Sequence, residues 1–305
     1  MAGLKQIKTK IVAMKKSQTV TKAMEAVSAA KMRRAQQAAL RGRAYARAAA
    51  TTLSRLSGSR DMTSHPLSAV RPVARALYIV ITSDKGLAGA LNSGVLKAAA
   101  RDIQTSGLSN KNVSILAVGR KANDYFTARG YTVEAFHPNN AAVTGGIVRA
   151  LVDEAAQQFT AGAVDKVTVV YQNFVSTFEQ RPTLRAVFPL SLADLEMVVK
   201  DIVPARGTYS DSAASEAVPA TYTLEPSEAE VLNTILPMLA SIIVYHALLE
   251  AGASEHSARM VAMKSASDKA AELQDKLTLQ YNKARQAAIT REVSEITGGM
   301  EAMAG

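Results

Sequence analysis

The chain contains no cysteine and no tryptophan, and aromatic residues make up only 5% of its 305 residues. The absence of cysteine excludes disulfides, thiolate zinc sites and cysteine nucleophiles. The shortage of aromatic side chains leaves little material for a surface on which nucleic-acid bases could stack. The first residues also lack an apolar stretch long enough for a secretory signal, so we expect a cytosolic or already processed chain.

Acidic residues are nearly absent from the first 60 positions. Glu25 is the single acid there, against fourteen lysines and arginines. The excess, 14 − 1 = +13, is larger than the net charge of +10 of the whole chain. Glycine and proline are also absent from residues 4–41. This pattern predicts one basic helix of 38 residues, about 57 Å long, which needs a long partner because a small domain is narrower than this.

A second long helix is predicted at the other end of the chain. Ser227 and Glu230 form an S-x-x-E capping box, and after Gly252 no glycine or proline occurs in residues 253–297. These 45 residues would form about 67 Å of helix. The two predicted helices are therefore of similar length and lie at opposite ends of the sequence.

Each end carries a narrow apolar stripe with steps of three and four residues, which is typical of a coiled coil. The stripes consist of Leu4, Ile7, Ile11 and Met14 at one end and of Ile289, Val293, Ile296, Met300 and Met303 at the other. Gln18 and Thr21 fall where the first stripe would continue. Pairing the two ends with each other, antiparallel, is the simplest way to cover both stripes.

The middle of the chain alternates short β-rich runs with helical stretches. Strands are predicted at residues 76–82, 113–118, 131–136, 166–174 and 182–190, and helices at 89–104, 120–129 and 147–159. This alternation is typical of βαβ units and a mostly parallel sheet, which makes the fold class α/β. The predicted segments are a helix in 1–60, an α/β domain in 73–203, a loop or insertion in 204–225 and a helix in 226–305.

One uncharged run, residues 231–249, is almost long enough to span a membrane. Its apolar residues Leu232, Ile235, Leu239 and Ile242 recur in steps of three and four, as in a buried helix. Glutamates rather than basic residues flank the run. We therefore favour a buried helix over a membrane span.

The chemistry-bearing residues do not assemble into a recognisable catalytic or cofactor motif. Gly86, Gly89 and Gly94 follow a strand, but they do not match G-x-G-x-x-G, and we expect such a turn to serve close packing. His246 and Glu250 share a helix face without an evident third metal ligand. We predict no catalytic, cofactor or metal site. A nucleic-acid-binding basic arm and a Rossmann-like dehydrogenase remain the alternatives.

Three parts of the sequence resemble the gamma subunit family of F-type ATP synthases. They are IKTKIVAMKKSQTVTKAMEAVSAAKMRRAQ (7–36), the turn TSDKGLAGALN (82–92), and the carboxyl-terminal runs ASEHSARMVAMKSASDKAAELQ (253–274) and LQYNKARQAAITREVSEITGG (279–299). The likeness is to the bacterial type, including its alphaproteobacterial or mitochondrial-like forms. Ala88 stands where the family often has cysteine. The family's fold is an antiparallel coiled coil of the two ends with a central Rossmann-like α/β domain.

The resemblance implies a mechanical function without a catalytic site or cofactor. Members of this family form the central rotor shaft of the proton-translocating ATP synthase. The shaft couples rotation of the c-ring to conformational change at the beta-subunit catalytic sites, and it regulates ATP hydrolysis and proton flow. The implied partners are the alternating alpha and beta subunits, an epsilon-type subunit, the c-ring, a delta subunit and an ATPase inhibitor protein, with no nucleic acid.

The implied location is peripheral, at the cytoplasmic face of the bacterial inner membrane or the matrix face of the mitochondrial one. The chain would meet the membrane only through the c-ring. The site residues carried over by resemblance fall into three groups. Beta-subunit contacts are expected at Lys22, Met24, Glu25, Lys85, Arg259, Gln286 and Thr290. The tip held in an apolar sleeve would comprise Ile296, Met300 and Met303, and the foot near the c-ring and epsilon-type subunit would comprise Tyr222 and Glu225.

Overall fold

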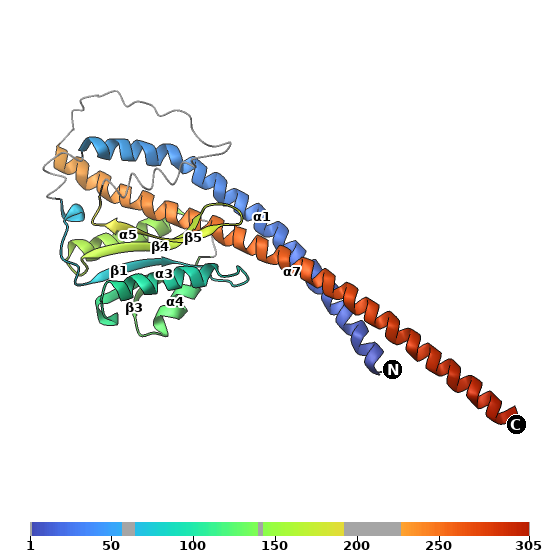
Figure 1. The fold of residues 1–305 in the computed structure, drawn as a ribbon. Coiled ribbons are helices and arrows are strands. Elements are labelled where there is room, and N and C mark those ends of the chain that lie inside the picture. The colour runs from blue at the N-terminus through green and yellow to red at the C-terminus, as the bar shows by residue number, and fades with distance from the viewer. Residues whose placement is uncertain (1, 57–64, 140–142, 192–226, 305) are drawn as a thin grey trace. The chain divides into compact units, whose positions relative to one another are not determined.

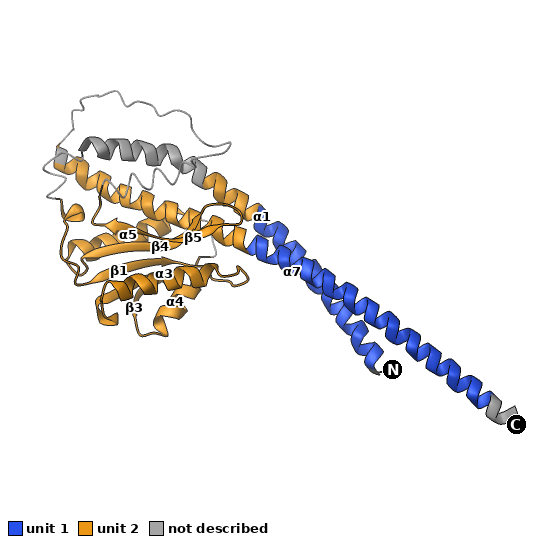
Figure 2. Cartoon of the chain, viewed as in Figure 1, with its two compact units in different colours: residues 1–29, 259–305 blue, residues 30–258 orange. Residues whose placement is uncertain are grey.

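The computed structural model describes residues 2–56, 65–139, 143–191 and 227–304 (Figure 1). The chain divides into two compact units, one formed by residues 1–29 and 259–305 and the other by residues 30–258 (Figure 2). Each of the two long helices contributes to both units, so the units do not coincide with the four segments predicted along the sequence. The segment predicted as a loop or insertion, 204–225, lies outside the described residues.

The two long helices extend further than their breaker-free stretches. Helix α1 spans Ala2–Leu56, inside the segment 1–60 predicted as a helix, and continues through Gly42 past the end of the breaker-free stretch at residue 41. Helix α7 spans Glu228–Ala304 and includes Pro237 and the Gly298–Gly299 pair. One glycine costs a helix only about 1 kcal/mol relative to alanine, so flanking helix-forming residues can carry the helix through it. The backbone N–H of Glu230 donates to Ser227 Oγ at 3.3 Å, which confirms one half of the predicted capping box.

The first unit is an antiparallel pair formed by the start of α1 and the end of α7 (Figure 2). On α1 the less exposed positions are Leu4, Ile7, Ile11 and Met14, as predicted, and they continue through Gln18 and Thr21. On α7 the less exposed positions again step by three and four residues. They include Met263, Ser267, Ala270, Gln274, Leu277, Tyr281, Ala284 and Ala288, with Ala266 and Ala271 beside them.

The prediction that the carboxyl-terminal stripe pairs with α1 is therefore wrong. Ile289, Val293, Ile296 and Met300 are 51–64% exposed, and all ten residues from 291 to 300 are exposed. Helix α7 runs past the amino-terminal end of α1 (Figure 2), so its last turns have no α1 surface to pack against. Periodicity identifies an apolar stripe, but it does not say how far along the stripe the partner extends.

The second unit contains a five-stranded sheet in the order β3-β2-β1-β4-β5. Its strands are β1 (Ala76–Ile81), β2 (Val113–Val118), β3 (Thr132–His137), β4 (Lys166–Phe174) and β5 (Gln180–Phe188). The first four are parallel, and β5 pairs antiparallel with β4 through a hairpin. All five strands confirm predicted runs, with shifts of up to two residues at their ends.

Helices cover both faces of this sheet. They include α3 (Leu91–Thr105), α4 (Arg120–Thr127) and α5 (Gly145–Thr160), which confirm the three predicted stretches, together with the first part of α7. Leu232, Leu236 and Leu239 of α7 pack with α5 in one core, while α3 and α4 form a second core on the opposite face. The uncharged run in α7 is long and apolar enough to cross a membrane by length and composition. Its burial in the first core agrees instead with the interpretation as a buried helix.

The contrast between these two units predicts where the isolated chain opens. Amides of β1 and β4 should exchange slowly with deuterium, because both strands are almost entirely buried in the two cores. Amides of α1 in the first unit should exchange quickly, because its less exposed positions include the polar residues Gln18, Thr21 and Ser28. Hydrogen exchange followed by mass spectrometry measures both sets in one experiment. Slow, cooperative exchange across residues 4–29 of the isolated monomer would contradict this expectation.

Candidate functional site

The basic side chains of α1 remain exposed in the folded chain. Every lysine and arginine with described exposure in this helix points to solvent. They are Lys5, Lys8, Lys10, Lys15, Lys16, Lys22, Lys31, Arg33 and Arg34. The neighbouring candidates Met24 and Glu25 are half-buried. The helix therefore presents a set of exposed positive charges, interrupted between Lys22 and Lys31 and called the basic row below, that a partner with acidic groups could recognise.

The candidate residues on α7 differ in how much surface they offer. Gln286 and Thr290 are both exposed, and Thr290 Oγ1 donates to the Gln286 carbonyl oxygen at 3.0 Å, as expected for residues one turn apart. Arg259 is only 9% exposed. A partner could therefore reach the side chains of Gln286 and Thr290 more easily than that of Arg259.

The surface of α7 between these positions carries less net positive charge than the start of α1, because residues 260–285 hold five lysines and arginines against three acids. Glu272 accepts hydrogen bonds from Lys269 Nζ at 2.7 Å and from Lys276 Nζ at 2.6 Å. The hydrogen bond from Lys269, followed by that from Lys276, lowers the pKa of Glu272 to about 2. Glu272 thus stays ionised at neutral pH and offsets nearby positive charge. The excess of positive charge is consequently larger on α1 than on this part of α7.

Lys85 belongs to the second unit, where it is exposed on the turn that follows β1. Ser83 holds this turn in place: its N–H donates to Asn92 Oδ1 at 2.9 Å and its Oγ donates to the Lys85 carbonyl oxygen at 2.6 Å. Asp84 Oδ1 accepts from the N–H of Arg120 at 2.8 Å. These bonds fix the backbone that carries Lys85, so the lysine is presented from a rigid turn.

The glycines of the same turn have a role that the sequence did not predict. Close packing was expected, but a Cβ on Gly86 or Gly89 would meet nothing within 4 Å. Gly89 instead adopts φ +57°, and Leu87 adopts the unfavourable left-handed value of +63°. The requirement for glycine at position 89 therefore comes from backbone conformation. No group of three His, Cys, Asp or Glu side chains that could hold a metal ion occurs in the part of the chain that the structure describes.

The remaining predicted site residues lie near the end of a described segment or outside the described residues. Ile296 and Met300 are each 64% exposed on the last turns of α7, and Met303 lies in the same helix. Tyr222 and Glu225 lie outside the described residues. Lys22, Met24, Glu25, Arg259, Gln286 and Thr290 fall in the same compact unit, whereas Lys85 falls in the other.

The sequence reasoning missed the turn of the β4–β5 hairpin, residues 175–179. The hairpin is tied to α7 by three hydrogen bonds, one of which is made by this turn. Phe178 in this turn is 84% exposed. A phenylalanine between two strands can belong to a buried core or to a surface. Whether Phe178 is buried or exposed depends on where the hairpin ends in the fold, so no signal in the sequence identified this residue.

The chain matches proteins of one family over almost its whole length. The family profile described as "ATP synthase" matches residues 3–303. The ATP synthase gamma chain of Staphylococcus haemolyticus is 37% identical, covering 99% of this chain and 100% of the relative. The corresponding protein of Pelotomaculum thermopropionicum is 38% identical with the same coverage. This chain belongs to the ATP synthase gamma-chain family.

Solved structures show the same fold as this gamma-chain family member at lower identity. A chain in the Euglena gracilis mitochondrial ATP synthase structure, described as OSCP/F1/c-ring, has a TM-score of 0.64 and 20% identity, covering 99% of this chain and 95% of that one. A chain from the central stalk and c-ring of the Tetrahymena thermophila enzyme has a TM-score of 0.61 and 23% identity, covering 81% and 99%. The predicted α/β fold with two long terminal helices is confirmed.

Proposed function

We propose that this chain is the central rotor shaft of a proton-translocating F-type ATP synthase. In this function it couples rotation of the c-ring to successive conformational changes at the beta-subunit catalytic sites, and it regulates ATP hydrolysis and proton flow. The observation that carries the proposal is the first unit: a slender pair of helices with an exposed basic surface and an exposed apolar end, in a member of the gamma-chain family.

The coupling between rotation and catalysis arises from differential binding of the shaft to the beta subunits. A shaft with different faces makes different contacts with each of three beta subunits. Each contact shifts the conformational equilibrium of its beta subunit only by the difference between the free energies with which the shaft binds the subunit's two conformations. The basic row of α1 would face acidic loops of the beta subunits. Lys22, Met24, Glu25 and Lys85 would lie at these contacts, with Arg259, Gln286 and Thr290 at a second beta-subunit loop.

The remaining parts have functions that follow from the same proposal. Ile296, Met300 and Met303 would be held in the apolar sleeve at the top of the alpha–beta ring. The foot around Tyr222 and Glu225 would meet the c-ring and an epsilon-type subunit. The chain would be a non-catalytic subunit, peripheral at the cytoplasmic face of the bacterial inner membrane.

Assembly is the most direct test of this proposal. A tagged full-length chain should co-purify with alpha and beta subunits as a complex that hydrolyses ATP, and membrane vesicles containing the complex should make ATP when a proton gradient is imposed. Recovery of the chain without alpha and beta subunits from cells that express the whole complex would contradict it. Retention of nucleic acid instead of these subunits would favour the alternative of a basic nucleic-acid-binding arm.

Replacing Gln286 by alanine should lower ATP turnover by the assembled complex. Gln286 is exposed, so the change removes a side chain available for contact without opening a core. A lost hydrogen bond to a charged partner is worth about 1.5–3 kcal/mol, and the lower figure corresponds to about a tenfold decrease in rate if the bond acts in the limiting step. Steady-state ATP hydrolysis measures the effect.

Gln280→Ala is the matched control for this test. Gln280 is also exposed on α7, but it lies six residues away and therefore on a different face of the helix. The control should hydrolyse ATP at the wild-type rate. Equal rates for both variants and the wild type would remove Gln286 from the proposed contact.

A further inference from the structure

The turn of the β4–β5 hairpin exposes two apolar side chains that its own unit leaves uncovered. Phe178 is 84% exposed and Val175 is 47% exposed. By contrast, Phe126, Phe159 and Phe188 of the same unit are completely buried. Aromatic residues are enriched among the anchors of protein interfaces, so an exposed phenylalanine on an organised turn is a candidate anchor.

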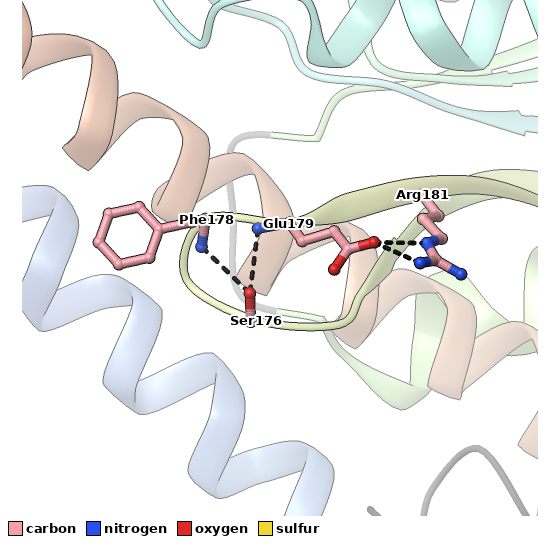
Figure 3. Close-up of polar contacts among 4 residues, drawn as sticks. All are labelled: Ser176, Phe178, Glu179 and Arg181. Carbon is pink, nitrogen blue, oxygen red and sulfur yellow. Dashed lines mark hydrogen bonds and ion pairs between the residues drawn. The ribbon is translucent and has the colours of Figure 1, made fainter.

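This turn has a closed network of hydrogen bonds of its own. The N–H groups of Phe178 and Glu179 donate to Ser176 Oγ at 3.3 and 3.1 Å, as Figure 3 shows. The N–H of Ser176 donates to the Glu179 carbonyl oxygen at 2.9 Å. Gln180 Nε2 donates to the carbonyl oxygens of Ser176 and Thr177, each at 3.1 Å. The turn is therefore organised before any partner binds, which lowers the entropy cost of binding.

The charged groups of the turn are directed away from Phe178 and neutralise each other. Arg181 Nε donates to Glu179 Oε1 at 2.7 Å, and the Phe178 ring points to the opposite side of the turn (Figure 3). The surface around Phe178 consequently carries no unbalanced charge from its own turn. Such a surface fits an apolar partner patch better than an acidic or basic one.

Three side chains on one face of α7 fasten the hairpin to that helix. Glu250 Oε2 accepts from the N–H of Phe174 at 2.8 Å, and Ser254 Oγ donates to the Gln172 carbonyl oxygen at 3.0 Å. Ser257 Oγ donates to the Thr177 carbonyl oxygen, within the turn itself, at 2.7 Å. A force applied at Phe178 would therefore pass directly to α7, the helix that continues into the shaft.

The turn also lies at the same edge of the sheet as Lys85. Strands β1 and β4 are neighbouring and parallel, with Val80 opposite Val170, so the segments that follow them leave from the same edge. Strand β4 continues four residues past Val170, about 13 Å. Leu87, which follows β1 on the turn that carries Lys85, adds a third apolar side chain at this edge and is 62% exposed.

We propose that Phe178, flanked by Val175, docks on an apolar patch of the beta subunit, beside the acidic loop that Lys85 would meet. The inference deepens the proposed function and rests on it, because the proposed contact of Lys85 with the beta subunit indicates which partner faces this edge. It adds to the electrostatic contacts an apolar anchor that is fastened to α7. The anchor would transmit the movement of the shaft at a position distinct from the coiled coil.

Site-directed photocrosslinking tests this proposal. Because the chain contains no cysteine, Phe178→Cys, Lys85→Cys and Val70→Cys each create a single thiol that takes a benzophenone maleimide before the complex is assembled. Val70 is 85% exposed and precedes the start of β1, so it serves as the exposed apolar control. Illumination should join positions 178 and 85 to beta, and position 70 should not form this product.

The outcomes separate this inference from the proposed function. If position 85 joins to beta while position 178 joins to the epsilon-type subunit, to the c-ring, to another copy of this chain or to nothing, the docking proposal is overturned and the proposed function stands. If neither position joins to beta in a correctly assembled complex, the proposed beta-subunit contact fails at this edge as a whole.

A measurement of ATP synthesis tests the same proposal without a crosslinker. Phe178→Ser should lower proton-driven ATP synthesis by at least about fivefold, because truncating an interface residue that contributes to binding costs more than about 1 kcal/mol. Phe178→Leu should retain most of the rate because it preserves apolar area. Val70→Ser should have no effect. Equal rates for Phe178→Ser and the wild type would overturn the proposal.

Discussion

Replacing Lys15, Lys16 and Lys22 together by glutamate is expected to lower proton-driven ATP synthesis by up to about a hundredfold. Each exposed ion pair is worth about 0–1 kcal/mol, so one Lys→Gln change should be nearly silent. Reversing three charges turns several weak attractions into repulsions, and the sum of about 3 kcal/mol corresponds to this factor. All three lysines are exposed on α1, so the chain itself should still fold.

Salt provides the internal check on this mechanism. Raising ionic strength from about 0.01 M to 0.15 M shortens the Debye length from about 30 Å to about 8 Å, so it should partly restore synthesis in vesicles. The matched control reverses Lys97, Arg101 and Lys111, which are exposed in the α/β unit. Wild-type synthesis by the α1 variant at low salt would mean that this basic row contacts nothing important. Lost nucleic-acid binding with intact synthesis would favour the nucleic-acid alternative.

The two terminal helices could be predicted from the sequence because their cause is local. Long stretches without glycine or proline, together with a capping box, favour a helix whatever surrounds it. The stripe on α1 was also predicted correctly from Leu4 to Met14. On α7, however, the stripe that packs against α1 is centred on small and polar residues such as Ser267, Ala270 and Gln274. Small residues give a weak periodic signal, so the stronger stripe at Ile289–Met303 was chosen instead.

The candidate site could be predicted only where the composition of the sequence and the family resemblance point to the same residues. The basic row of α1 follows from composition, and its exposure agrees with that interpretation. Contacts at Lys85, Gln286 and Thr290 come from resemblance alone and stay predictions. The turn around Phe178 could not be found, because its exposure and its attachment to Ser257 depend on residues 80 positions apart. Contacts of that kind arise from the fold and not from a local pattern.

Gly119→Ala is expected to destabilise the α/β unit by about 3–5 kcal/mol, a large share of the stability of an ordinary domain. Gly119 adopts φ +90°, which is strained for any side chain, and a Cβ there would lie 2.1 Å from the Thr82 carbonyl oxygen. That oxygen also accepts from Asn139 Nδ2 at 2.7 Å, while Thr82 Oγ1 accepts from the N–H of Ala122 at 2.9 Å. The backbone at the end of β1 has little freedom to move away.

The same clash should disturb the turn that carries Lys85, because Thr82 is the first residue of that turn. Gly130→Ala is the control, since Gly130 also has positive φ, +74°, but a Cβ there would meet nothing within 4 Å. It should cost about 1–2 kcal/mol from backbone strain alone. Urea denaturation of the α/β unit in the full chain measures both changes. A cost for Gly119→Ala no greater than that for Gly130→Ala would show that the end of β1 yields, and that the rigidity assigned to the Lys85 turn is wrong.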